Sequence, residues 1–187
     1  IWGKKGWLQE LKTDAAYDVD DLLPAVRNGL SIDGKLFAAP FYGESSMLMY
    51  RKDLADKAGV QVPERPTWPQ IKDLAAKMHD PKNGVYGICL RGKPGWGDNM
   101  AFITTLVNTF GGQWFDLQWK PQLESKPWKD AITFYVDLLK NYGPPGSSSI
   151  IFNQILALTN PGTCGMWTDA TITASFVSDP HQSPDHA

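Results

Sequence analysis

The sequence lacks the features that identify several common classes of protein. Its basic residues form no run longer than the pairs Lys4-Lys5 and Arg51-Lys52, so it has no basic patch of the kind that binds nucleic acid. No apolar stretch approaches the roughly 20 residues that cross a bilayer. The glycine-rich nucleotide-binding motifs and the His-Glu-x-x-His zinc motif are also absent. These absences argue against a nucleic-acid-binding protein, a membrane-spanning protein and enzymes of those two motif classes.

Histidine and cysteine are scarce, with three and two residues respectively. His79 is predicted at a helix end, whereas His181 and His186 lie in a polar tail, which is poor material for a catalytic triad or a metal site. We therefore expect no catalytic residue, no metal and no cofactor. Cys89 and Cys164 have no metal-binding spacing. They are either two buried free thiols or a single disulfide, which would normally require an oxidising compartment.

The two ends of the sequence resemble cuts in a longer chain. Residue 1 is isoleucine, and no signal peptide precedes the first predicted elements. The last seven residues, 181–187, are polar and close no helix or strand. With 42% apolar residues, 20% charged residues and a net charge of −2, the composition is that of an ordinary globular protein.

Apolar spacing, capping residues and glycine stops predict an α/β fold. Asp33-Gly34 between apolar residues predicts a hairpin turn. Short strands that alternate with helices indicate a largely parallel sheet. A long extended segment is expected over residues 35–50, and short strands over 85–90 and 164–167. Helices are expected over residues 3–11, 19–28, 53–58, 67–79, 99–110, 125–142 and 150–158, with another that starts near residue 170.

The sequence is rich in tryptophan, with eight in 187 residues. Several of them, among them Trp96, Trp114 and Trp167, sit beside or near glycine or aspartate in predicted loops. Core packing explains any single tryptophan about as well as ligand binding does, because the side chain contributes a large buried area anywhere. Aromatic rings on loops also form the flat walls on which sugar rings or polyol chains rest. The excess therefore favours a carbohydrate-like ligand.

Charged residues near predicted strand ends could bind such a ligand. Ligands of α/β sheets lie beyond the carboxyl ends of the strands. Arg91 and Asp98 lie in the loop after one strand, Asp169 follows another, and Glu44 lies in the long extended segment. A lone charge near a strand is usually only solvated, but carboxylates accept paired hydrogen bonds from hydroxyls, and arginine donates in the opposite sense. Together with tryptophan faces, these residues predict a polyhydroxyl site.

Two other functional classes stay open at this point. Two carboxylates could hydrolyse a glycosidic bond, and the separation of Glu44 from Asp169 would discriminate, because retaining and inverting glycosidases hold their carboxylates about 5 and about 6.5–9.5 Å apart. A non-catalytic interaction module would have no enclosed pocket near these residues.

A series of motifs follows in order along the chain: Leu36-Phe-Ala-Ala-Pro-Phe-Tyr-Gly-Glu-Ser-Ser-Met-Leu-Met-Tyr-Arg-Lys-Asp-Leu54, Ala58-Gly59, Pro66-Thr67-Trp68, Phe110-Gly-Gly-Gln-Trp-Phe-Asp116, Phe134-Tyr-Val-Asp-Leu-Leu139 and Cys164-Gly-Met-Trp-Thr-Asp169. This series resembles the extracellular solute-binding proteins of sugar ABC transporters, the group that includes maltose-binding protein, and the resemblance covers residues 2–180. One further segment, Tyr86-Gly-Ile-Cys-Leu-Arg-Gly-Lys-Pro-Gly-Trp-Gly-Asp-Asn-Met-Ala-Phe102, looks like the sorbitol/mannitol branch of that group.

The resemblance implies an α/β, periplasmic-binding-protein-like two-lobe fold, here incomplete and mostly the second lobe. It places residues 1–40 in the first lobe, 41–50 in a crossing hinge strand and 51–187 in the second lobe. The implied function is to bind a sugar alcohol or small sugar and deliver it to the membrane permease subunits of an ABC importer. The protein would be exported to the periplasm and monomeric when full length.

The predicted ligand site combines both lines of reasoning. The resemblance makes Glu44, the loop from Trp96 to Asn99, and Asp169 ligand-contacting, in agreement with the strand-end argument. The strand-end argument adds Arg91, and two aromatic residues are expected to flank the ligand as walls. The full set of predicted ligand-binding residues is Tyr42, Glu44, Arg91, Trp96, Asn99, Trp114 and Asp169, of which Tyr42 and Trp114 are the walls.

Overall fold

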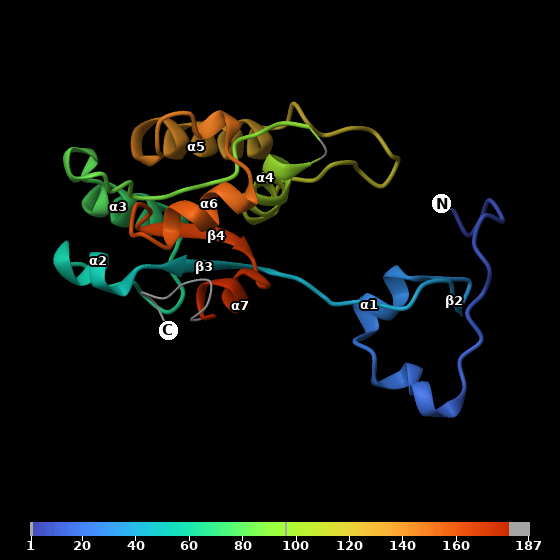
Figure 1. Ribbon diagram of the computed structural model, residues 1–187. Coiled ribbons are helices and arrows are strands. Elements are labelled where there is room, and N and C mark those ends of the chain that lie inside the picture. The colour runs from blue at the N-terminus through green and yellow to red at the C-terminus, as the bar shows by residue number, and fades with distance from the viewer. Residues whose placement is uncertain (1, 96, 180–187) are drawn as a thin grey trace. The chain divides into compact units, whose positions relative to one another are not determined.

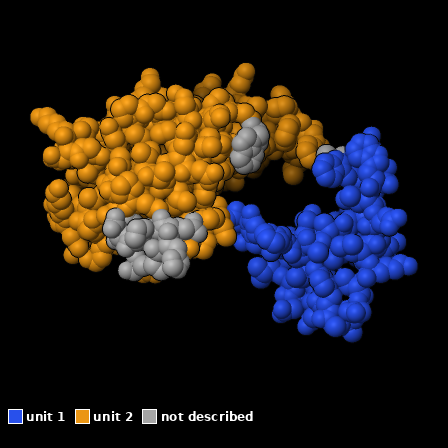
Figure 2. Space-filling model, viewed as in Figure 1, with its two compact units in different colours: residues 1–44 blue, residues 45–187 orange. Residues whose placement is uncertain are grey.

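The computed structural model describes residues 2–95 and 97–179 of the chain. The chain divides into two compact units, residues 1–44 (unit 1) and residues 45–187 (unit 2), which Figure 2 shows in different colours. The division falls inside the segment that the sequence predicts to be extended. The assignment of these units to the two lobes of a solute-binding protein stays a prediction.

Unit 1 contains little regular structure. The helix predicted over residues 3–11 is wrong, because residues 2–6 form a turn in which the N–H of Gly6 donates to the carbonyl of Gly3 at 3.0 Å. Gly6 has a φ of 71°, a left-handed value that ends any right-handed helical path and favours glycine. A single turn of 3-10 helix, Ala15–Tyr17, comes next, with the side chain of Asp14 as its N-cap.

The helix predicted over residues 19–28 is divided in two. Val19–Asp21 forms a 3-10 helix, and α1 covers Pro24–Gly29. Leu23, the residue before the proline, has an extended ψ of 127°. Proline disfavours the α conformation of the residue that precedes it and cannot donate a helical hydrogen bond. The apolar spacing therefore identified helical segments but missed the break at Pro24.

The hairpin predicted at Asp33-Gly34 is confirmed. β1 (Ser31–Ile32) and β2 (Lys35–Leu36) pair antiparallel, with Ile32 opposite Lys35. Asp33 and Gly34 both have positive φ, 50° and 76°. Two positive values are what a two-residue turn of type I′ requires, and this turn matches the twist of the flanking strands.

Unit 2 carries most of the secondary structure. No helix in the described part of the chain is both long enough and apolar enough to cross a membrane. Single turns of 3-10 helix cover Pro81–Asn83 and Ser147–Ser149. The α-helices are α2 (Lys52–Lys57), α3 (Trp68–Met78), α4 (Asp98–Thr109), α5 (Lys126–Tyr142), α6 (Phe152–Thr159) and α7 (Thr173–Val177).

A two-stranded antiparallel ribbon runs through unit 2. It joins β3 (Ser46–Tyr50) to β4 (Met166–Ala170), with Met47 opposite Asp169. The helices α4 and α6 contact β4, and α5 packs against α3 and α4. In Figure 1 these four helices lie on one side of the ribbon and α7 lies on the other. The ribbon thus brings the two ends of the unit's sequence together under one helical layer.

The largely parallel sheet expected from the sequence is wrong. The segment 85–90 makes only two isolated parallel bridges, Tyr86 to Cys164 and Cys89 to Trp167. Both bridges keep the same register, since each joins residues 78 positions apart, but the ladder is interrupted between them, where the N–H of Ile88 donates to the carbonyl of Tyr142. Segment 85–90 therefore lies beside β4 without a continuous ladder, and the one extended ladder of unit 2 in the described residues is the antiparallel β3–β4 pair.

The core of unit 2 lies between α3, α4 and α5. The helix predicted over residues 125–142 is confirmed as α5, in which Trp128, Tyr135 and Leu138 are buried, whereas Ile132 is 36% exposed. Burying the apolar face of this 17-residue helix stabilises it far more than its intrinsic propensity does. A smaller cluster around Trp167 and Ile155 packs on the other side of segment 85–90.

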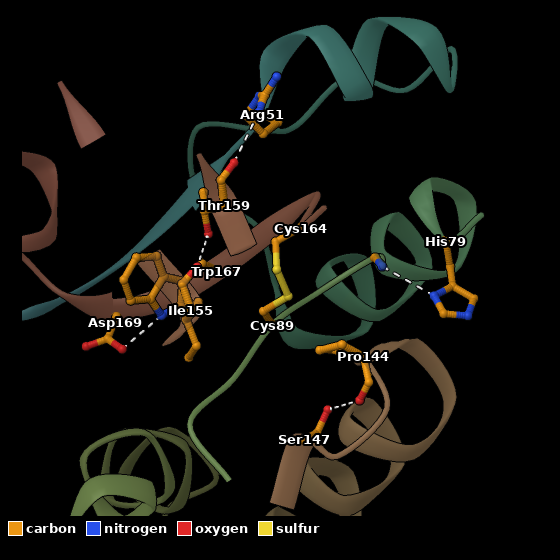
Figure 3. Close-up of a disulfide and its surroundings, with 11 residues drawn as sticks. Arg51, His79, Cys89, Pro144, Ser147, Ile155, Thr159, Cys164, Trp167 and Asp169 are labelled. Atoms are coloured by element: carbon orange, nitrogen blue, oxygen red, sulfur yellow. Dashed lines mark hydrogen bonds between the residues drawn. A yellow bond between two sulfur atoms is a disulfide. The ribbon is translucent and has the colours of Figure 1, made fainter. Parts of the chain in front are cut away.

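Cys89 and Cys164 form a disulfide, so the free-thiol alternative is wrong. Their Cα atoms are 5.9 Å apart, and both residues are fully buried. Figure 3 shows the bond between segment 85–90 and the chain that enters β4. It closes a loop of 75 residues and therefore removes much of the conformational freedom of the unfolded chain.

Replacement of both cysteines by alanine should lower the free energy of unfolding. Chain entropy predicts a loss of about 4 kcal/mol for a loop of this length, and cavity formation adds to it. Urea denaturation with and without reductant measures the effect. Reductant should destabilise the native protein and leave the double alanine variant unchanged. Equal stability of the native and double-variant proteins under oxidising conditions would contradict the disulfide.

Candidate functional site

Three of the seven predicted ligand residues lie in one part of unit 2. Arg91 and Asp169 are in direct contact. Asn99 lies in the first turn of α4, directly after Asp98, which is also a partner of Arg91. The two strand-end loops that the sequence predicts to bind ligand therefore both contact one guanidinium group.

The other four predicted residues lie elsewhere or outside the description. Tyr42 and Glu44 belong to unit 1, where Tyr42 is 56% exposed. Trp114 follows α4 in unit 2, is 38% exposed, and packs edge-to-face on Trp128 with their ring centroids 4.9 Å apart. Trp96 lies outside the described residues. The exposed rings of Tyr42 and Trp114 are accessible, and their role as walls stays a prediction.

Asp169 is saturated with hydrogen-bond donors. It is the fourth residue of β4 and is 7% exposed. Its Oδ2 accepts from Arg91 Nε at 2.8 Å and from the indole N–H of Trp167 at 2.8 Å, the second of which Figure 3 shows. Its Oδ1 accepts from Arg91 Nη2 and from the backbone N–H of Ala170, the latter at 2.7 Å. Because a carboxylate has about four lone-pair sites, these four donors use its full capacity.

Arg91 is fixed through its backbone and through its side chain. The hydroxyl of Tyr135 on α5 donates to the carbonyl of Arg91 at 2.7 Å. Burial raises the pKa of Tyr135 to about 12, so the hydroxyl stays protonated and can donate at any physiological pH. The guanidinium lies over the ring of Phe152, with its Cζ 5.1 Å from the centroid. Cation–π attraction adds to the ion pair in this water-poor position.

The charge of Arg91 is stabilised by two carboxylates. The hydrogen bonds that Arg91 donates to Asp169, together with the negative charges of Asp169 and Asp98, raise the pKa of Arg91 above its usual value, although burial acts in the opposite direction. The side chain of Arg91 is only 11% exposed. A buried arginine needs such partners, because an unpaired charge in this position would cost several kcal/mol.

Asp98 is the third member of what we call the acid–arginine cluster: Arg91, Asp98 and Asp169. It opens α4 and is 2% exposed. Its Oδ1 accepts from Arg91 Nη1 at 3.4 Å, a long hydrogen bond. The cluster holds two carboxylates and one guanidinium, and so carries a formal charge of −1.

The loop between Arg91 and Asp98 is closed at its base. The N–H of Asn99 donates to the carbonyl of Lys93 at 3.2 Å, and the N–H of Gly92 donates to the carbonyl of Ile150 at 3.1 Å. Gly97, which precedes α4, has a φ of 121°, a value that only glycine adopts readily. These contacts hold the start of α4 against the guanidinium of Arg91.

Sequence reasoning missed several parts of this arrangement. It counted Asp98 among the candidate acids but left it out of the ligand set. Trp167 was noted only as a loop aromatic, although its indole N–H anchors Asp169. Phe152 lies in the helix predicted over residues 150–158 but was not connected to the site, and neither was Tyr135 in the helix predicted over residues 125–142. Among the described residues, no group of three or more histidine, cysteine, aspartate and glutamate side chains could hold a metal ion.

Comparison with known proteins identifies the family. A family model described as bacterial extracellular solute-binding protein matches residues 1–185. The chain belongs to this family. The resemblance inferred from the motifs, and with it the periplasmic-binding-protein-like fold class, is confirmed.

Individual members of the family are closely similar. A mannitol-binding protein of Pseudomonas aeruginosa is 54% identical over 184 residues, which are 98% of this chain and 42% of that protein. A crystal structure of a solute-binding protein from Agrobacterium vitis with bound D-mannitol is 59% identical, with a TM-score of 0.90 over 98% of this chain and 45% of that chain. A structure from Agrobacterium radiobacter in complex with ribitol is 29% identical, with a TM-score of 0.86 over 99% of this chain and 47% of that chain.

The chain therefore spans a little under half the length of these relatives. They belong to the two-lobe periplasmic sugar-binding proteins, so the chain corresponds to an incomplete part of that fold.

Replacement of Arg91 by methionine should destabilise unit 2 strongly. It leaves Asp98 and Asp169 buried without a cation, which costs about 3–5 kcal/mol of unfolding free energy. Adding Asp98→Asn should restore part of the loss, because one of the two uncompensated charges is removed. Lys126→Met is the matched control, since Lys126 pairs with Asp130 on the surface and should contribute less than about 1 kcal/mol. Urea denaturation of the four proteins provides the comparison, and equal losses for Arg91→Met and Lys126→Met would contradict the role of the cluster.

Proposed function

We propose that this chain contributes to a periplasmic binding protein that captures a sugar alcohol and delivers it to the permease subunits of an ABC importer. The observation that carries the proposal is the relative with bound D-mannitol, at 59% identity over nearly the whole chain. The acid–arginine cluster supports it independently, because buried charged groups at strand ends suit a neutral molecule with several hydroxyls.

The proposed ligand residues are those that the sequence predicts. Residues 1–40 would belong to the first lobe, 41–50 to the crossing strand and 51–187 to the second lobe. The boundary between the compact units, at Glu44 and Ser45, is consistent with this assignment. In unit 2 the cluster and the first turn of α4 would present polar groups to the ligand. The residues proposed to form the site are Glu44, Arg91, Trp96, Asn99 and Asp169, with Tyr42 and Trp114 as walls.

Binding without turnover is the expected behaviour. Glycoside hydrolysis would require Asp169 to transfer a proton or to attack a sugar carbon. Its four hydrogen bonds leave no lone pair for either step. A full-length protein that contains this sequence should release no product from aryl glycosides. Multiple turnovers that Glu44→Gln abolishes would support the hydrolase instead.

Ligand preference should follow the polyol branch of the family. Calorimetric titration of the full-length protein with D-mannitol, sorbitol and maltose should give the tighter binding with a hexitol. Trp96→Ala should weaken hexitol binding, because a stacked aromatic wall contributes a large share of the contact area in such pockets. Trp119→Ala is a suitable control, since this tryptophan is 79% exposed and is not one of the proposed ligand residues. Maltose binding tighter than either hexitol would overturn the ligand class.

A further inference from the structure

The two acids of the cluster differ sharply in how their hydrogen-bonding capacity is used. Asp169 accepts four hydrogen bonds, from Arg91, Trp167 and Ala170. Asp98 accepts a single long one, at 3.4 Å, within the described part of the chain. Both are almost completely buried, at 7% and 2% exposure. The two carboxylates are similarly buried but accept different numbers of hydrogen bonds, which indicates that they have different roles.

A buried carboxylate that is short of donors is costly. Each missing hydrogen bond to such a charge is destabilising when water cannot replace it. Asp98 does not compensate by capping its own helix, since no N–H of the described part of α4 donates to its side chain. The start of the 12-residue helix α4 only lowers the cost, because the positive end of the helix dipole favours a negative charge there.

Arg91 cannot satisfy Asp98 any better. Its Nε and Nη2 form a bidentate pair with Asp169, and its carbonyl is held by Tyr135. Only Nη1 points to Asp98, at a distance set by those other contacts. The cluster therefore keeps a formal charge of −1 and unused acceptor sites on one carboxylate. Such a site favours a molecule that brings hydrogen-bond donors, and neighbouring hydroxyls of a polyol can both donate to one carboxylate.

We infer that Asp98 is the specificity-determining acid of unit 2, where it accepts hydrogen bonds from ligand hydroxyls. Asp169 and Arg91 are positioning residues that act through Asp98 and the loop after Arg91. This assignment rests on the proposed function and refines it, because it separates the acid that contacts the polyol from the acid that holds the contact in place.

The test compares Asp98→Asn with Asp169→Asn and with Asp130→Asn in the full-length protein. Asp130 is a half-exposed carboxylate on α5 that pairs with Lys126, and it serves as the control. D-Mannitol affinity should fall about ten- to a hundredfold in Asp98→Asn, the range for a lost charge-assisted hydrogen bond. Its denaturation midpoint should stay the same or rise, because a surplus buried charge is removed. Asp169→Asn should lower the midpoint strongly, and Asp130→Asn should change neither quantity.

Deoxyhexitols that each lack one hydroxyl of mannitol identify the contact. At least one should bind the native protein about tenfold or more weakly than mannitol, yet bind Asp98→Asn about as well as mannitol binds that variant. Mannitol affinity unchanged in Asp98→Asn, or the same deoxy penalties in both proteins, would overturn the role of Asp98 alone. Failure of the native protein to bind any hexitol would overturn the proposed function and this inference with it.

Discussion

The contact between Arg91 and Asp169 is the interaction on which the rest of the candidate site depends. It joins the loop that follows segment 85–90 to the end of β4, two parts of the chain separated by 78 positions. The guanidinium binds both oxygens of the carboxylate, a geometry that fixes orientation as well as distance. Burial makes this geometry obligatory, because either charge left without its partner would be strongly destabilising.

A covalent bond braces the same two segments. Cys89 lies two residues before Arg91, and its disulfide partner Cys164 lies five residues before Asp169. The isolated bridge from Cys89 to Trp167 runs between these links. Segment 85–90 lacks a continuous ladder to β4, so the disulfide and the ion pair supply the attachment that regular strand pairing would otherwise give. The site can therefore be rigid even though the sheet beneath it is small.

The sequence predicted the local features of this fold better than its long-range pairing. Asp33-Gly34 was recognisable because few residue pairs tolerate two positive φ values, and α5 because one face is apolar over 17 residues. The parallel sheet was inferred from the alternation of short strands with helices, a pattern that does not reveal that the ladder is interrupted between residues 86 and 89. The helix predicted at residues 3–11 failed for a local reason, since Gly6 turns the chain.

In the candidate site, too, the sequence predicted which residues take part better than how they contact one another. Strand-end position and residue type were enough to predict Arg91 and Asp169 in the same site, and the structure places them in contact. No sequence pattern could show that, among the described residues, Asp169 receives four donors and Asp98 one, because this depends on where Trp167 and Tyr135 point after folding. The sequence can therefore suggest which carboxylates belong to a site, whereas their roles become clear only from the hydrogen bonds that they accept in the structure.

The surplus negative charge of the cluster also bears on selectivity. A sugar acid differs from a hexitol by a carboxylate in place of one hydroxymethyl group, so its size and most of its hydroxyls are unchanged. Close to Asp98 that carboxylate would meet a like charge in surroundings that water screens poorly, and it would bring acceptors where the site needs donors. A neutral polyol meets neither penalty. If Asp98 contacts the ligand as inferred, the same imbalance that favours hydroxyl donors should also disfavour anionic sugars.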